Sequence, residues 1–507
     1  MRITNNMMLR NTTTNINGNK VNVNSLNNQM SSQKKISRPS EDPVVAIRAL
    51  RLRSNLSEIN QYYENNIPDA ESWLDVTETA LNNMKEILTD VRTQCVYGAT
   101  DSLEYKDRKT ILTSLQSLRE QLYAEGNSDY AGRTVFTGYR TNEKLTFMTD
   151  EDDTEYQITE NFTFNDIEEH RYYSGQVELG TAADMVADTS NVSDPTRVNY
   201  DRIRLAYGGI NAAPTVTYTT TDATTGAVTQ NTLAITTTYD TLQDWQAAGS
   251  ACGDNETVFI RGTGELILGK DISEELKQNE SQLTFDYQKK GFDKGEVRPE
   301  YYFNCTDVTA TNAEPIVYQK YDANGNEISQ DINYIIANSQ TLTVNTNASD
   351  VFDESMGRDV DEMISAMQAS IDAHDKLDKI NEMMALAEYS DEDSQAALQT
   401  WKDAVQKEVD YADDNVQKLY NSYIGRFDGY LGDVNLAITT VGSKGDRLEL
   451  TETRMSNQQL TVETLKSSNE DRELSDIIID YTAAYTAYEA SLQAAGMINQ
   501  TTLLNYI

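Results

Sequence analysis

Histidine and cysteine, the residue types most often used for catalysis and for binding transition metals, are scarce in this chain. The 507 residues include two histidines, His170 and His374, and three cysteines, Cys95, Cys252 and Cys305. Neither histidine lies in an HExxH or related motif, and no two cysteines have the CxxC spacing of zinc and redox sites. We therefore expect buried or incidental thiols and no disulfide framework. We expect no catalytic residue, metal site or cofactor, and hence no enzyme.

Three weaker patterns are better explained as ordinary structure. The acidic run at residues 150–153 lacks EF-hand spacing, so we expect a solvated loop rather than a calcium site. Glu168 and Glu169 beside His170 make a common surface pattern. The GxG at residues 262–264 is more typical of a turn between strands than of a phosphate-binding loop. A hydrolase in the middle of the chain therefore has no convergent set of polar residues to support it.

The chemistry that the sequence does favour is apolar association between helices. Near the C-terminus, large apolar side chains recur every three or four residues, at Leu474, Ile478, Tyr481, Tyr485, Tyr488 and Leu492. This 3.5-residue period predicts the seam of a coiled coil, which needs a partner helix.

A more dilute stripe of the same period lies near the N-terminus, at Leu9, Thr12, Ile16, Asn19, Val23, Leu26 and Met30. Because Asn and Thr are poor helix formers, we expect this segment to be disordered in the monomer and helical only when packed. The predicted assembly interface combines both ends of the chain: Leu9, Ile16, Val23, Leu26, Met30, the six C-terminal residues above, Leu503 and Leu504.

The remaining elements follow from two changes of pattern along the chain. A stripe with the helical period runs through residues 45–95, and another returns at Val441, Leu448, Met455 and Val462. Between them, residues 126–350 are rich in Thr, Asp, Tyr and Gly, and alternating runs at 215–220 and 232–238 predict strands. The expected fold class is mainly α with a β-rich insertion: an elongated helical bundle built from the N- and C-terminal segments, with the β domain looped out from the middle.

The predicted domains follow these elements. Residues 1–40 and 456–507 form terminal coiled-coil segments, and residues 41–140 and 351–455 form the core of the helical bundle. Residues 141–350 form a β-rich variable outer domain, with two subdomains as an open alternative.

Charge and hydropathy exclude two classes of partner. The 42 basic and 81 acidic residues give a formal net charge of -39, which repels phosphate backbones and anionic membrane surfaces. No run of 18 apolar residues occurs, and the N-terminus has no apolar signal segment. We therefore expect neither nucleic acid binding nor membrane insertion, and if the protein is exported, we expect a route other than the general secretory one. A mean hydropathy of -0.60 suits a molecule with much exposed surface.

Several sequence segments resemble the bacterial flagellin superfamily and, within it, the family of hook-filament junction proteins. They are MRIT at residues 1–4, KKISRPSEDP at 34–43, NIPDAESWLDVTETALNNMKEIL at 66–88, GRTVFTGYRTNEKLTF at 132–147, and the C-terminal segment 482–507. The PSEDP loop and the aromatic-Thr-Gly-aromatic turn at Phe136–Tyr139 are more similar to junction proteins than to filament flagellins.

The resemblance implies a structural, flagellin-like protein of the extracellular bacterial flagellum. It implies a ring of copies of this chain between the hook-proximal hook-associated protein and flagellin, assembled by pairing of the terminal helices. It further implies passage through the type III export apparatus with the help of an export chaperone. Two alternatives stay open: a flagellin filament subunit, and an adhesive module in the middle domain that is displayed on the surface.

Overall fold

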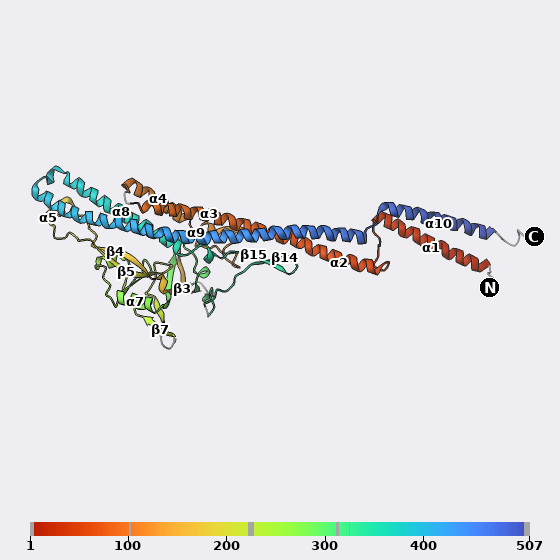
Figure 1. Cartoon of the computed structure of the whole chain (residues 1–507), viewed down its shortest axis with the longest axis horizontal. Helices are drawn as coiled ribbons and strands as arrows, with labels where there is room; N and C mark the ends of the chain where they lie inside the picture. Colours follow the sequence, from red (N-terminus) through yellow and green to blue (C-terminus); the bar gives the residue numbers. More distant parts are fainter. Residues whose placement is uncertain (1–4, 101–102, 222–227, 311–313, 324, 501–507) are drawn as a thin grey trace, which may run out of the picture. The chain divides into compact units, whose positions relative to one another are not determined.

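The computed structural model describes residues 5–100, 103–221, 228–310, 314–323 and 325–500 (Figure 1). These residues fall into two compact units, each built from distant parts of the sequence. The first unit comprises residues 1–71, 333–342 and 445–507, and the second comprises residues 72–332 and 343–444. The predicted fold class, mainly α with a β-rich insertion in the middle, is confirmed.

The first unit brings the two ends of the chain together. Helix α1 (Asn5–Ser32) packs against α10 (Leu474–Gln500), and Figure 1 shows them side by side in red and dark blue. Helix α2 (Pro43–Asn60) follows the proline-containing loop, and the Asp42 carboxylate caps it by accepting from the backbone N–H groups of Val44 and Val45. The hairpin of β14 (Asn333–Ala337) and β15 (Gln340–Thr343) completes the unit.

Two long helices carry the repeating stripes that the sequence predicts. Helix α2 continues through a π-helical segment, Gln61–Asn66, into α3 (Ile67–Gly98), so the chain remains helical through Pro68. Helix α9 spans Glu392–Glu470. The stripe positions of α3 from Ile67 to Cys95 are all buried, as are Val441, Leu448 and Met455 of α9. These positions are therefore confirmed as faces of the core, whereas Val462 and the stripe positions Val45, Leu52, Asn60 and Tyr63 are only half-buried.

The helices of the second unit are α3 with α4 (Tyr105–Gln121), α8 (Ser355–Met384) and the N-terminal part of α9. A buried guanidinium joins three of them: Arg108 of α4 donates to Ser370 of α8 and to Asp413 of α9, each at 2.6 Å. Further along, an apolar cluster between α8 and α9 encloses Trp401, whose indole N–H donates to the Met185 carbonyl at 3.0 Å. This contact fixes the short helix α5 (Ala182–Ala187) to the helical layer.

The β-rich insertion contains two main sheets. One has the order β4-β5-β10-β9-β8 and is antiparallel except between β8 and β9. The other has the order β13-β12-β3-β11-β6-β7 and is antiparallel throughout. The strands are β1 (Asp129–Tyr130), β2 (Arg133–Thr134), β3 (Glu151–Thr163), β4 (Glu168–Ser174), β5 (Thr196–Arg204), β6 (Thr215–Thr221), β7 (Val228–Leu233), β8 (Thr237–Tyr239), β9 (Thr257–Ile260), β10 (Glu265–Leu268), β11 (Gln282–Phe292), β12 (Asn304–Asp307) and β13 (Ile316–Tyr318).

Three local predictions in this region can be compared with the strands. The threonine-rich runs pair as β6 and β7, although their connecting residues 222–227 lie outside the described part of the chain. The GxG at 262–264 forms the turn between β9 and β10, as predicted, and Gly264 has a φ of 64°. The solvated loop expected at residues 150–153 is wrong in part: Asp150, Asp152 and Asp153 are exposed, but β3 already begins at Glu151. The two remaining short helices are α6 (Leu242–Ala247) and α7 (Lys270–Gln278).

Candidate assembly surface on the terminal helices

The face of α1 that packs against α10 is the face that the sequence predicts. Its stripe positions are all half-buried, namely Leu9, Thr12, Ile16, Asn19, Val23, Leu26 and Met30. The polar member Asn19 does not interrupt the contact, because its amide donates to Ser491 Oγ at 3.2 Å and to the Ala487 carbonyl at 3.4 Å. A dilute apolar stripe can therefore pair in register when the partner helix supplies matching acceptors.

The face of α10 that packs against α1 is only partly the predicted one. It consists of fully buried Ile477 and the half-buried residues Tyr481, Ala484, Tyr488, Ser491 and Ala495. Tyr481 and Tyr488 were expected on this seam. The other seam residues are mostly small, and a search for large apolar side chains does not detect them. Small residues let two helices approach closely, so the 3.5-residue spacing of small residues was the sequence signal that could have revealed this seam.

The other predicted residues of α10 form a second stripe beside this seam, and each of them is partly exposed. Leu474, Ile478, Tyr485 and Leu492 are 43%, 47%, 44% and 43% exposed. Their assignment to a seam within the chain is therefore wrong, since the buried face lies about one residue further round the helix. Leu503 and Leu504 lie outside the described residues. Contiguous exposed apolar surface of this kind is typical of protein interfaces.

Helix α2 presents exposed apolar side chains as well. Val44, Ile47 and Leu50 are 58%, 53% and 65% exposed, and their three-residue spacing places them along one side of the helix. The first unit therefore carries apolar residues at the surface of both α2 and α10.

Ion pairs and backbone hydrogen bonds hold the loop after α1 against the loop before α10. The backbone N–H of Lys35 donates to the Glu470 carbonyl at 2.8 Å, and that of Arg472 donates to the Gln33 carbonyl at 3.0 Å. Arg53 of α2 binds the Glu470 carboxylate at 2.6 and 2.8 Å. The hydrogen bond from Arg53 lowers the pKa of Glu470. The start of the PSEDP-containing loop is therefore hydrogen-bonded to the segment that precedes α10.

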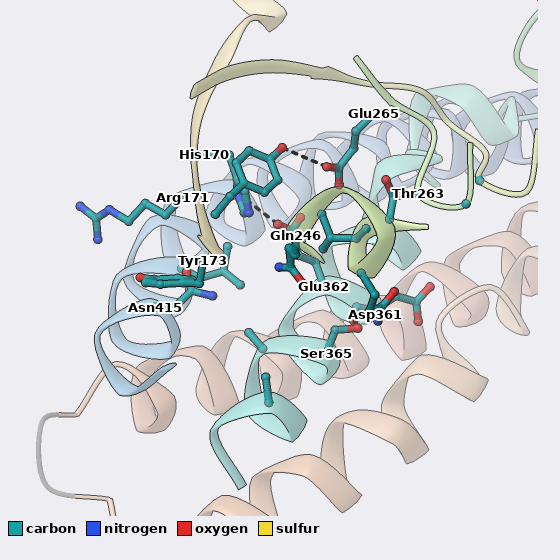
Figure 2. Close-up of a pocket in the computed structure, with 18 of the residues that line it drawn as sticks. His170, Arg171, Tyr173, Gln246, Thr263, Glu265, Asp361, Glu362, Ser365 and Asn415 are labelled. Carbon is teal, nitrogen blue, oxygen red and sulfur yellow. Dashed lines mark hydrogen bonds and ion pairs between the residues drawn. The ribbon is translucent and has the colours of Figure 1, made fainter. Parts of the chain in front are cut away.

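Side chains capable of chemistry gather elsewhere, around a pocket of about 620 Å³ in the second unit (Figure 2). His170 lines this pocket and its Nδ1 lies 3.3 Å from a Glu362 carboxylate oxygen. Burial lowers the pKa of His170, an effect to which Arg202 adds. Glu168 also pairs with Arg202, at 2.9 Å. The reading of Glu168 and His170 as a surface pattern is therefore wrong, because their partners come from β5 and α8, far away in the sequence.

The other histidine and the cysteines, which could also take part in chemistry, are paired with a carboxylate or buried. His374 Nε2 lies 3.1 Å from Asp413. The thiols of Cys95, Cys252 and Cys305 are free and buried. Within the described ranges, no three His, Cys, Asp or Glu side chains are grouped so as to hold a metal ion. No helix in the part of the chain that the structure describes is both long and apolar enough to cross a membrane.

Comparison with known proteins identifies relatives of the N-terminal helices. Residues 3–141 match the family described as the bacterial flagellin N-terminal helical region. The chain is 31% identical over 142 residues to flagellar hook-associated protein 3 of Salmonella typhimurium, and 32% identical over 114 residues to flagellar hook-associated protein 3 of Escherichia coli. These matches cover 28% and 22% of this chain, and 44% and 36% of the relatives. The chain thus spans less than half the length of either relative.

Solved structures with similar descriptions also match. A putative flagellar hook-associated protein from Vibrio parahaemolyticus is 14% identical, with a TM-score of 0.35, covering 85% of this chain and 100% of that one. The flagellar junction protein FlgL from Legionella pneumophila is 12% identical, with a TM-score of 0.30, covering 84% and 100%. The predicted resemblance to the flagellin superfamily is confirmed, and residues 3–141 are the region that carries it.

Proposed function

We propose that this chain is a structural component of the bacterial flagellum that connects the hook to the flagellin filament. The observation that carries the proposal is the match of residues 3–141 to the flagellin N-terminal region, together with relatives named hook-associated protein 3. The pairing of α1 with α10 supports it, because it unites the two ends of the chain in one unit. In this role the protein is not an enzyme and needs no cofactor.

Assembly in this proposal uses the exposed stripe of α10. Leu474, Ile478, Tyr485 and Leu492 pack against neighbouring copies of this chain, which form a ring. Burying each such side chain contributes roughly 1.5–3 kcal/mol. The faces of the ring contact the hook-proximal hook-associated protein on one side and flagellin on the other. The inner seam with α1 then fixes the orientation of the stripe.

The proposal extends to the route by which the chain reaches the flagellum. The chain passes unfolded through the type III export apparatus, with an export chaperone bound, and reaches the extracellular tip. The free cysteines and the dilute α1 stripe support this route, since neither locks the ends before export. Residues 1–40 and 456–507 become ordered on assembly, while residues 41–140 and 351–455 form the bundle. Residues 141–350 form the outer domain.

A second candidate, a flagellin subunit of the filament itself, is favoured by the description of the matched region. Location separates the two candidates. Immunogold labelling of intact flagella should give a discrete signal at the boundary between hook and filament. Labelling along the whole filament would replace the junction role with the flagellin role.

A further inference from the structure

The pocket of Figure 2 is lined only by residues of the second unit, and none of them belongs to the proposed assembly surface. Strands β4 and β5 and helix α6 line one side, and helices α8 and α9 line the other. Its volume of about 620 Å³ is within the range of roughly 300–1,000 Å³ that is usual for small-molecule sites. The structural role proposed above does not use this pocket.

With one exception, carboxylates of the chain neutralise the arginine and lysine side chains that line the pocket. Arg202 lies 2.8 Å from Glu362, and Lys289 lies 3.4 Å from Glu296. Arg171 and Arg204 also have carboxylate partners, Asp414 and Asp359. The exception is Arg358 of α8, which forms no ion pair with any residue that the structure describes.

The environment of Arg358 compensates its charge only in part, although Glu265, Asp361 and Glu362 lie near enough to favour the charged form. The side chain is half-buried, and Nη2 donates to the Thr263 carbonyl. Its Nη1 is buried and has no hydrogen-bond partner among the described residues, and the same is true of Thr263 Oγ1. Burial, with the nearby Arg204 guanidinium, lowers the pKa of Arg358. A buried guanidinium nitrogen without a hydrogen-bond partner is costly, so Nη1 favours a ligand that supplies an acceptor, such as a carboxylate oxygen.

Uncharged groups in the lining of the same pocket suit a ligand that carries hydroxyls. The half-buried amides of Gln246 on α6 and Asn415 on α9 make no side-chain hydrogen bond within the described part of the chain. In Figure 2 Gln246 lies between Thr263 and Asn415. The rings of Tyr173 and Tyr411 lie 5.6 Å apart and add an apolar surface to the wall. Amides can both donate to and accept from hydroxyl groups.

We propose that this pocket binds an acidic sugar, whose single carboxylate pairs with Arg358 and whose hydroxyls bind Gln246 and Asn415. The lining contains six carboxylates and five arginine or lysine side chains. A dianion such as phosphate is therefore disfavoured, whereas one carboxylate matches the one unpaired guanidinium.

The test is calorimetric titration of the full chain with three probes: methyl glucuronide, methyl glucoside and inorganic phosphate. The first two differ only in the carboxylate. The glucuronide should bind with a dissociation constant of about 1 mM or tighter, and at least tenfold more tightly than either other probe. No binding of the glucuronide, equal binding of the glucoside, or tighter binding of phosphate would each overturn the proposal.

Variants identify the residues responsible. Arg358→Gln should weaken glucuronide binding at least tenfold while leaving the melting temperature unchanged or raised, because it removes a charge that the chain compensates only in part. The matched control is Arg92→Gln, which removes an exposed pair with Asp428 outside the pocket and should bind as wild type. If Arg358→Gln fails to fold, Ala369→Trp, which fills the pocket at an exposed lining position, should abolish binding. Undiminished binding by the folded variant would contradict the assignment.

Discussion

At the scale of single residues, burial sets the behaviour of the ionisable groups in the sheets. Glu160 of β3 is 2% exposed, and it accepts hydrogen bonds from the Tyr287 hydroxyl and from the Ala206 backbone N–H. Burial nevertheless raises the pKa of Glu160 to about 7. The folded state thus holds a proton that the unfolded chain releases near pH 4.3.

This difference predicts how stability depends on pH. Since the folded pKa is raised, the contribution of Glu160 is complete below about pH 4.3 and is lost as pH rises to about 7. The Glu160→Gln variant removes this loss, so it should gain up to about 3 kcal/mol relative to wild type between pH 4 and pH 8. Urea unfolding of both proteins at several pH values measures the gain. A difference independent of pH would show that Glu160 does not titrate in this range.

At the scale of elements, α10 has two apolar faces that serve different contacts. Ile477 and its small neighbours pack against α1, whereas Leu474, Ile478, Tyr485 and Leu492 remain exposed. A charge introduced on the exposed face of α10 (Leu474, Ile478, Tyr485 and Leu492), its outer face, should leave the single chain folded and prevent contacts with other copies. A charge on the face that packs against α1 should instead destabilise the single chain.

Tyr485→Asp tests the outer face. We expect the unfolding free energy of the monomer to change by no more than about 0.5 kcal/mol, because Tyr485 is 44% exposed. Motility and filament attachment should be lost, since the charge would be buried between copies. Swimming assays and thermal melting measure the two effects. Ala483→Asp, an exposed position away from both faces, is the control and should behave as wild type. Normal motility of Tyr485→Asp would exclude this stripe from assembly.

The connection between the loops at the base of α1 and α10 is a second test at this scale. Arg53→Ala leaves the Glu470 carboxylate, 5% exposed, without its strongest partner. Because Arg53 itself is 57% exposed, we expect a modest loss of about 1 kcal/mol at pH 7. Arg53 lowers the folded pKa of Glu470, so its contribution is present above about pH 4.3 and disappears in acid. Melting curves of both proteins at pH 7 and pH 3 should differ only at pH 7, and an equal difference at both would rule out the ion pair.

At the scale of the whole molecule, we expect assembly to require α10. Truncation of residues 474–507 should leave a folded, helical second unit, because none of its residues belongs to that unit. The truncated chain should not join the hook. Circular dichroism measures the first outcome and electron microscopy of complemented cells the second. Filament growth supported by the truncated chain would show that α10 is dispensable.

The sequence was informative wherever a pattern repeats locally. The stripe of α3 and the positions Val441, Leu448 and Met455 were predictable because the helical period alone determines the buried face. The α1 face was predictable for the same reason. The inner seam of α10 was predictable only in part, at Tyr481 and Tyr488, because Ala484 and Ser491 pack by being small.

Contacts between distant residues could not be predicted. Strand β3 pairs with β11 through partners such as Ile158 and Tyr287, which lie more than a hundred positions apart. Nothing in either strand specifies that partner. The pocket has the same origin: Arg202 and Glu362 meet only because the sheet packs on α8. That Arg358 in this pocket lacks an ion pair among the described residues is visible only once the structure shows where the neighbouring charged side chains lie.

The most direct test of the junction role is negative-stain electron microscopy of cells that lack this chain, with assay of flagellin in the medium. The proposed function predicts hooks without filaments and flagellin lost to the medium, both reversed by the wild-type chain. Filaments of normal length on the hooks of the deletion strain would contradict it.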